Sequence, residues 1–345
     1  MKKFLLSSAF VCIATISANA QQLLSDNFDS YTVGNVGTDI TGATPGQGSW
    51  FTAVGTGGAN ANFQFVAETG KGNVLTIESP AVPATTTGTS NSRLASKVGF
   101  TNAMWNTKTA GNNILKVEYE FYTGGTTTSK SIHQVSVSST AAALGGFRYE
   151  PLTKTLSGLS RYDNSGTIGY YYFELGSNDT PLVLDANTWV KVVVLIDFST
   201  NKVHWQVPSK SIDLNIAAPL TGQQPSQISF VATGGPTGNA SATTIKYDNY
   251  VVSAVNTTTA TVNDIVSTKF NVYPNPATDV ITITNTESIG IDKITVADIN
   301  GRIAKTNNYN QQAEIQLNVS DLNAGVYILN VSTKEGTATK KFIKK

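Results

Sequence analysis

From Leu23 to about Ala254 the chain is a succession of short segments in which apolar and polar residues alternate. Clusters of Gly, Asn, Asp, Thr and Pro separate them. Alternation with period two predicts β-strands, because successive side chains of a strand point to opposite faces of a sheet. In residues 115–122, LKVEYEFY, one face is therefore expected to be core. No longer window has a helical period, so we expect an all-β domain of two stacked sheets.

Residues 188–198, TWVKVVVLIDF, are more continuously apolar than the other segments. Such a run is typical of a central strand that is covered on both faces. The next residues, STNK, turn the chain into a return strand in which Val203, Trp205 and Val207 share a face. We assign Trp205 and Trp189 to the core, because both lie in apolar alternation.

A second block of strand patterns begins at residue 269 and continues to 345. Residues 255–268 lack aromatic residues, and we interpret them as a linker after a first domain of residues 21–254. Asn300-Gly301 stands between two alternating runs, as in a type I′ hairpin turn. Roughly 80 residues suffice for a single small core. We therefore expect a second, smaller β-sandwich.

The first twenty residues have the pattern of a signal peptide. A basic start precedes a short apolar stretch, and Ala18-Asn19-Ala20 is the small-x-small pattern of a cleavage site. We expect cleavage between Ala20 and Gln21, followed by export. No later stretch approaches the about 20 apolar residues of a membrane helix, so no transmembrane segment is expected after cleavage.

Charge and cysteine content exclude several functional classes. The formal net charge is only +1, which gives no electrostatic reason to expect nucleic acid as a partner. Cys12 is the single cysteine, and it lies inside the expected signal peptide. The mature chain would therefore have no disulfide, thiolate nucleophile or cysteine-ligated metal.

Four blocks of the second domain occur in a characteristic order: VYPNPATDVITI (272–283), ITVADINGRIAKT (294–306), LNAGVYILNVST (322–333) and KKFIKK (340–345). Together they resemble the type A sorting domain of the bacterial type IX secretion system, over residues 270–345. The resemblance implies that an outer-membrane translocon reads this domain after the signal peptide has crossed the inner membrane. It also implies a sorting protease as partner, and a cargo that is either released or attached to the cell surface.

The resemblance also names the residues expected to carry the sorting signal: Pro274, Asn275, Pro276, Gly301, Gly325, Tyr327 and Lys341. The prolines lack backbone donors, so we expect them at an edge where the sandwich begins. Gly325 and Tyr327 are expected to form a tight turn followed by a packed aromatic ring. For Lys341 two hypotheses stay open, a contact with the translocon or a solvated edge that prevents aggregation.

Three stretches of the first domain, DNFDSYTVG (26–34), 187–207 and IKYDNYVVSA (245–254), are similar to concanavalin-like jelly rolls, the laminin-G and glucanase group. This resemblance implies a jelly-roll sandwich, and fold alone does not give function. Such folds often join their first and last strands through a calcium ion, so Asp26, Asp29 and Asp248 are candidate ligands of a structural calcium. The alternative is that these aspartates form turns. The sequence points to no cofactor other than this candidate structural calcium.

Catalysis is one hypothesis for the first domain. Glu118 and Glu120 share a face of one predicted strand, with Cα atoms roughly 6.5 to 7 Å apart, which could suit the carboxylate pair of a glycosidase. The third carboxylate of the glucanase motif is missing. Residues 131–134, SIHQ, and Arg148–Glu150 are similar to two blocks of alginate lyases, in reversed order and without the third, tyrosine-rich block. His133 and His204 belong to no cluster with metal-ligand spacing.

Binding is the hypothesis that we favour over an enzyme. Sugars are held by aromatic faces flanked by planar polar side chains. Trp50, Gln134, Arg148 and Tyr171 are the candidate ligand residues, and Trp50 either lies exposed on a loop or closes one end of the sandwich.

The sequence therefore predicts a secreted or cell-surface protein that binds an extracellular glycan or mediates adhesion. The alternatives are a hydrolase or lyase that uses a polar face with Glu118, Glu120 and Arg148, and a structural surface protein.

Overall fold

The computed structural model describes residues 20–82, 91–97, 100–236, 239–258, 270–285, 289–298, 302–333 and 336–345. The chain forms two compact units, residues 1–258 and 259–345, and each is described by itself. Ala18 of the expected cleavage site, residues 259–268 of the expected linker, and Gly301 with Asn300 of the expected hairpin turn lie outside the described residues.

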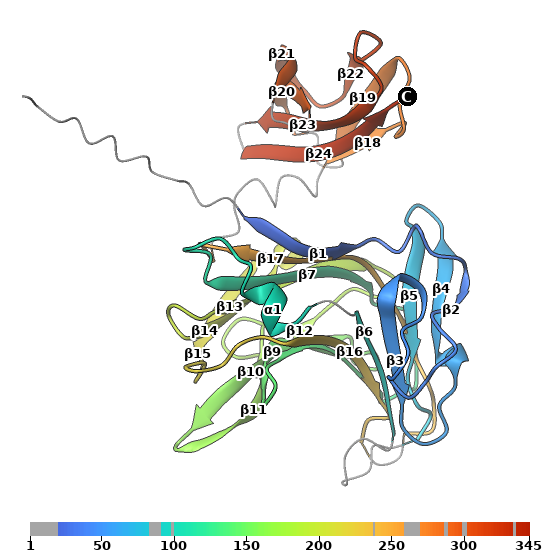
Figure 1. The fold of residues 1–345 in the computed structure, drawn as a ribbon, viewed down its shortest axis with the longest axis vertical. Helices are drawn as coiled ribbons and strands as arrows, with labels where there is room; N and C mark the ends of the chain where they lie inside the picture. Colours follow the sequence, from blue (N-terminus) through green and yellow to red (C-terminus); the bar gives the residue numbers. More distant parts are fainter. Residues whose placement is uncertain are drawn as a thin grey trace, which may run out of the picture. The chain divides into compact units, whose positions relative to one another are not determined.

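The first unit is a sandwich of two antiparallel sheets that face each other across one apolar core (Figure 1). The first sheet has the order β15 (Ile212–Ala217), β14 (Lys202–Val207), β13 (Trp189–Asp197), β7 (Ile114–Tyr122), β17 (Thr244–Val255), β5 (Gly72–Glu78), β4 (Phe63–Glu68) and β2 (Gly34–Asn35), with β1 (Gln21–Asp26) paired to β17. The second sheet has the order β11 (Thr167–Glu174), β10 (Thr155–Asn164), β9 (Ala143–Glu150), β8 (Ile132–Ser138), β16 (Gln227–Thr233), β6 (Ser92–Lys97) and β3 (Trp50–Val54), with β12 (Leu182–Val183) paired to β10.

The chain crosses repeatedly from one sheet to the other. It leaves the first sheet after β7, builds β8 to β12 in the second sheet, returns for β13 to β15, and crosses twice more for β16 and β17. Such crossing lets each strand bury one face against the opposite sheet. The prediction of an all-β jelly-roll sandwich is confirmed.

Burial along the strands follows the alternation in the sequence. In β7, Val117, Tyr119 and Phe121 are buried, whereas Glu118 and Glu120 lie half-buried on the outer face. Trp205 of β14 is buried in the core as expected. Trp189 is not, because it pairs with Tyr122 across β13 and β7 and shares the outer face with that ring. Its assignment to the core was wrong, since the apolar run around it conceals which face it occupies.

Helical structure is sparse. The helix α1 (Asn102–Trp105) is a single turn, and its first residue follows Thr101, whose hydroxyl accepts a hydrogen bond from the amide of Met104 at 3.3 Å. Within the described part of the chain, no helix has the length and apolar character needed to cross a membrane.

The second unit is a smaller sandwich. One sheet has the order β18 (Phe270–Tyr273), β19 (Val280–Asn285) and β22 (Ile315–Asn318), and the other has β21 (Ile303–Gln312), β20 (Ile291–Asp298), β23 (Gly325–Thr333) and β24 (Gly336–Lys344). A separate apolar core lies between them. Tyr327 is buried in it and stacks on Phe342 at 5.6 Å between ring centroids, as expected for a packed aromatic residue.

Two local expectations for this unit differ from the structure. Pro274 and Pro276 follow β18 and end it, so they do not introduce the first strand of the sandwich. Gly325 is the first residue of β23, and the turn lies before it at residues 320–324. The terminal lysine candidate, Lys341, lies exposed on β24.

Candidate functional site

Glu118 and Glu120 share the outer face of the first sheet, as the alternation predicts, but lysines neutralise both. Glu118 lies 2.6 Å from Lys116 and 3.2 Å from Lys191. Burial raises the pKa of the Glu118 carboxyl, yet Lys191 and Lys116 outweigh it and the pKa is lowered overall. Glu118 therefore stays ionised near neutral pH, which is the opposite of what a general acid needs.

Glu120 belongs to a second cluster on the same face. It forms an ion pair with Lys71 and accepts a hydrogen bond from Asn249 at 2.7 Å. Asp248 stands opposite Glu120 on the neighbouring strand and lies 3.5 Å from Lys71. Burial raises the pKa of Asp248 to about 6, with a smaller opposing effect from Lys71. The Lys71 ammonium also lies 4.7 Å above the Trp189 ring, so its charge is already shared among several partners.

Arg148 is on the other sheet. Glu118 and Glu120 point outward from β7 in the first sheet, and Arg148 points outward from β9 in the second. The outer faces of a sandwich point in opposite directions. The polar face with all three residues, on which the enzyme alternative depended, therefore does not exist. Spacing along the sequence could not show this, because the chain changes sheets between residues 122 and 132.

The outer face of the second sheet brings a different set of residues together. Gln134, Arg148, Ser157 and Glu174 form one cross-strand row over β8, β9, β10 and β11. Arg148 donates to Glu150 at 2.8 Å, and its guanidinium lies 4.7 Å from the centre of the Tyr172 ring. We call Gln134, Arg148, Glu150, Tyr172 and Glu174 the Arg148 cluster.

Two members of the Arg148 cluster are not saturated by contacts within the described residues. The Tyr172 side chain is 58% exposed, although Arg148 lies against its ring. The Oε2 atom of Glu174 is buried and accepts no hydrogen bond within the described part of the chain. A buried carboxylate oxygen without a partner is costly, so a donor that reaches it after a turn of the Glu174 side chain would be favourable there.

Tyr171 lies on the opposite side of β11 from the Arg148 cluster, and the sequence prediction singled out neither Tyr172 nor Glu174. Tyr171 lies half-buried and meets Tyr162 edge-on at 5.9 Å, on the side of β11 that also carries Phe173. A shift of one residue along a strand moves a side chain to the other face. The sequence did hold the necessary signal, because alternation in 170–174 separates Tyr170, Tyr172 and Glu174 from Tyr171 and Phe173.

Trp50 does not lie on the surface. It is fully buried at 0% exposure, packs against Phe28 and Phe230, and donates from its indole nitrogen to Asp26 at 2.9 Å. Trp105 is likewise buried, against Phe198. Neither ring is accessible to a sugar in this conformation, so the exposed-loop alternative for Trp50 was wrong.

The three aspartates proposed for calcium are already partnered by protein donors. Asp26 accepts from the Tyr31 hydroxyl at 2.5 Å, from Trp50 and from the Lys97 ammonium. Asp29 accepts from the Asn73 amide at 2.9 Å, and Asp248 from the Asn249 amide at 2.7 Å. Among the described residues no three His, Cys, Asp or Glu side chains converge as metal ligands. The residues present do not fit a calcium ion, because a lysine occupies the place of the cation at Asp26.

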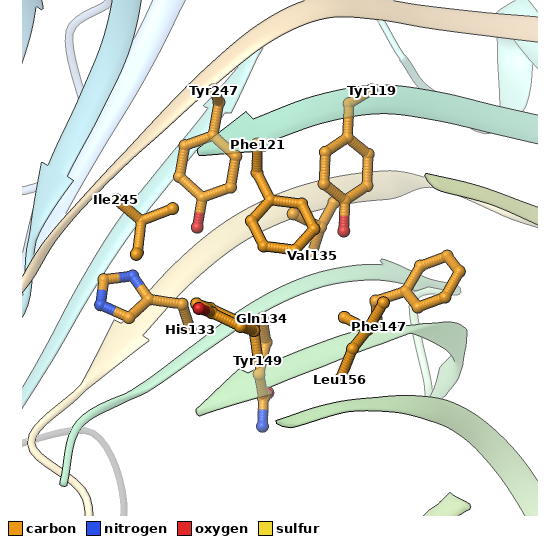
Figure 2. Close-up of a pocket in the computed structure, with 10 residues that line it drawn as sticks. All are labelled: Tyr119, Phe121, His133, Gln134, Val135, Phe147, Tyr149, Leu156, Ile245 and Tyr247. Atoms are coloured by element: carbon orange, nitrogen blue, oxygen red, sulfur yellow. The ribbon is translucent and has the colours of Figure 1, made fainter. Parts of the chain in front are cut away.

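A small internal cavity lies between the sheets, beside β7, β8 and β17 (Figure 2). It offers about 10 Å³ for the centre of a water molecule, the least that one water needs. The hydroxyl ends of Tyr119 and Tyr247 point into it from the first sheet, and His133 approaches from the second, whereas the Gln134 amide points away (Figure 2). The pocket suits one water and is too small for a sugar.

Among the residues that line this cavity, His133 is the one whose pKa is shifted within the acidic range. Its side chain is 2% exposed, and neither ring nitrogen makes a hydrogen bond of acceptable geometry with the described residues. Burial lowers the pKa of His133 to about 3, against a smaller opposing effect of the Thr243 backbone. The imidazole is therefore neutral inside the folded unit at physiological pH.

Three solved structures show a distant likeness to the chain. The binding domain of botulinum neurotoxin serotype C1 aligns with a TM-score of 0.44 and 11% identity, over 92% of this chain and 72% of that one. The binding domain of botulinum neurotoxin DC in complex with SialylT gives 0.40 and 10%, over 92% and 72%. A sialidase gives 0.42 and 12%, over 72% of this chain and 19% of its own length. Scores below 0.5 carry no argument about this chain.

Sequence comparison is specific for the second unit. No curated protein matches the chain. A family model described as the secretion system C-terminal sorting domain matches residues 271–345, which include every described strand of the second unit except the first residue of β18. Residues 271–345 therefore belong to the type IX secretion system C-terminal sorting domains, and the chain is exported to the medium or to the cell surface.

Proposed function

We propose that the first unit binds an extracellular glycan on the outer face of its second sheet, at the Arg148 cluster. The observation that carries the proposal is the exposed Tyr172 ring lying against Arg148 beside the unpartnered oxygen of Glu174. An aromatic surface with a few convergent polar groups is the usual composition of a small-molecule site.

Each group of the cluster supplies a different contact. The Tyr172 ring offers an apolar face for the C–H groups of a sugar. The Gln134 amide both donates and accepts hydrogen bonds, and Arg148 donates. The unpartnered Glu174 oxygen accepts from a hydroxyl once its side chain turns toward the ligand. The ion pair with Glu150 holds the guanidinium in place before a ligand arrives, which lowers the ordering cost of binding.

The charge of the cluster favours a neutral glycan. Two carboxylates, Glu150 and Glu174, surround one cation, Arg148, so the site carries a net negative charge. A uronate or sulfated sugar would meet like charge there. A neutral polysaccharide would instead satisfy the acceptors through its hydroxyl groups.

The test is retention of the purified full chain on a panel of insoluble neutral and acidic polysaccharides, with simultaneous measurement of released sugar. We expect retention on at least one neutral polysaccharide without new reducing or unsaturated ends. Tyr172→Ala should weaken that retention about tenfold or more, as for an aromatic residue at the centre of an interface. Glu174→Gln should also weaken it while preserving the shape of the side chain.

The matched control is Tyr273→Ala, which removes a tyrosine of similar exposure, 50%, from the second unit. Retention of this variant should equal that of the unmodified chain. Absence of retention on every polysaccharide would overturn the proposal and favour a structural surface protein. Release of new chain ends would instead favour the hydrolase or lyase alternative.

A further inference from the structure

We infer that Asn275 is a positioning residue of the sorting signal, because its side chain fastens the last strand of the chain to the proline motif. The two motifs, PNP at 274–276 and KKFIKK at 340–345, lie about 65 positions apart in sequence. Nothing in their spacing shows that they meet. The inference concerns export, and it is independent of glycan binding by the first unit.

The contact is made by one carboxamide. The Asn275 side-chain oxygen accepts a hydrogen bond from the backbone amide of Ile343 at 2.8 Å, and its nitrogen donates to the carbonyl of Lys341 at 3.4 Å. In a β-sheet, the backbone of one residue likewise offers one acceptor and one donor to residues two apart on the neighbouring strand. The Asn275 carboxamide imitates this pairing with Ile343 and Lys341. Asn275 therefore takes the place of backbone at the outer edge of β24.

The prolines explain why a side chain is needed. Pro274 and Pro276 have no amide hydrogen, so the backbone on either side of Asn275 cannot donate to a neighbouring strand. Regular pairing resumes at Ala277, whose amide donates to Ile343 at 2.7 Å and whose carbonyl accepts from Lys345 at 2.8 Å. Ala277 is fully buried and anchors the segment in the core of the second unit.

The consequence is a defined presentation of the chain end. β24 is the last strand of its sheet, with β23 as its full-length partner, so its outer edge depends on residues 275–277 for pairing. With the strand held, Phe342 is buried while Lys341 and Ile343 point to solvent, as period two requires. Loss of the contact at Asn275 would leave the backbone amide of Ile343 without its acceptor on the outer edge and loosen that edge, while β23 still pairs with β24 on the other side.

The test compares variants of the full chain in a bacterium with a type IX secretion system. Asn275→Ala should reduce the protein in the medium or on the cell surface several-fold and accelerate hydrogen exchange in peptides covering 336–345. Asn275→Asp retains the acceptor for Ile343 and should be intermediate in both. Asn308→Ala removes an exposed asparagine from β21 and should change neither.

A second variant tests whether Asn275 acts by positioning the last strand or only by stabilising the second unit. This variant destabilises the core of the second unit at a position away from Asn275. Ile281→Val removes a buried methyl group from β19 and should lower the thermal stability of the second unit. If Asn275 acts by positioning, Ile281→Val is exported normally at a comparable loss of stability, and exchange in 336–345 stays slow. Equal export defects in the two variants, or normal export of Asn275→Ala, would overturn the inference.

Discussion

At the scale of single residues, the buried imidazole of His133 makes the stability of the first unit sensitive to acid. The pKa is about 3 in the folded chain and about 6.5 in an unfolded one, so the unfolded state binds more protons below pH 6.5. Stability from the neutral imidazole is complete above that pH and is lost as the pH falls toward 3. At pH 4.5 the loss is about 2 to 3 kcal/mol.

We expect His133→Leu to flatten the fall of unfolding free energy between pH 6.5 and 4.5, measured by urea denaturation. The surrounding Tyr119, Tyr149 and Tyr247 have raised pKa values and stay neutral in this range. Asp248 acts in the opposite direction, because its raised pKa of about 6 adds stability as the pH falls. A double variant with Asp248→Asn isolates the contribution of His133, and an unchanged slope would contradict the prediction.

At the scale of elements, Asp26 connects the end of β1 to β3 and β6. Its carboxylate accepts hydrogen bonds from Trp50 in β3 and from Lys97 in β6. The side chains of Asp26 and Lys97 are both largely buried. Asp26→Ala would leave the Lys97 ammonium without its carboxylate in a poorly solvated place. We expect a loss of about 3 to 5 kcal/mol in unfolding free energy, measured by denaturant titration.

The matched control is Asp213→Ala, which removes an exposed aspartate from the edge strand β15. It should change the unfolding free energy by less than about 0.5 kcal/mol. Replacing both partners, Asp26→Ala with Lys97→Met, should recover part of the loss, since no unpaired charge then remains. A single variant as stable as the unmodified chain would show that Asp26 is dispensable.

At the scale of the whole molecule, the two units have separate cores, and the second one is the sorting domain. Deletion of residues 271–345 removes most of the second core and leaves every core residue of the first unit in place. We expect the shortened chain to accumulate in the periplasm, where cell fractionation and immunoblotting would detect it. Its appearance in the medium at the normal level would contradict the assignment of the sorting domain.

The strands differ in how well the sequence predicts their buried face. Alternation identified β7 and the return strand β14 correctly, because one buried face imposes period two on the sequence. It failed at Trp189, because a continuous apolar run does not show which face each residue occupies. In residues 170–174 the alternation does separate Tyr172 from Tyr171. The tyrosine of the Arg148 cluster is therefore Tyr172, one residue from the predicted Tyr171.

The sequence by itself determined the all-β class, the two separate strand patterns and the sorting domain, since local alternation and contiguous motifs encode all three. Tertiary structure alone decided which residues meet. It placed Glu118 and Arg148 on opposite faces, because the chain changes sheets between them. It buried Trp50 against Asp26, and it joined Asn275 to β24 across the second unit. Contacts between distant strands depend on the order of strands in a sheet, and no local pattern records that order.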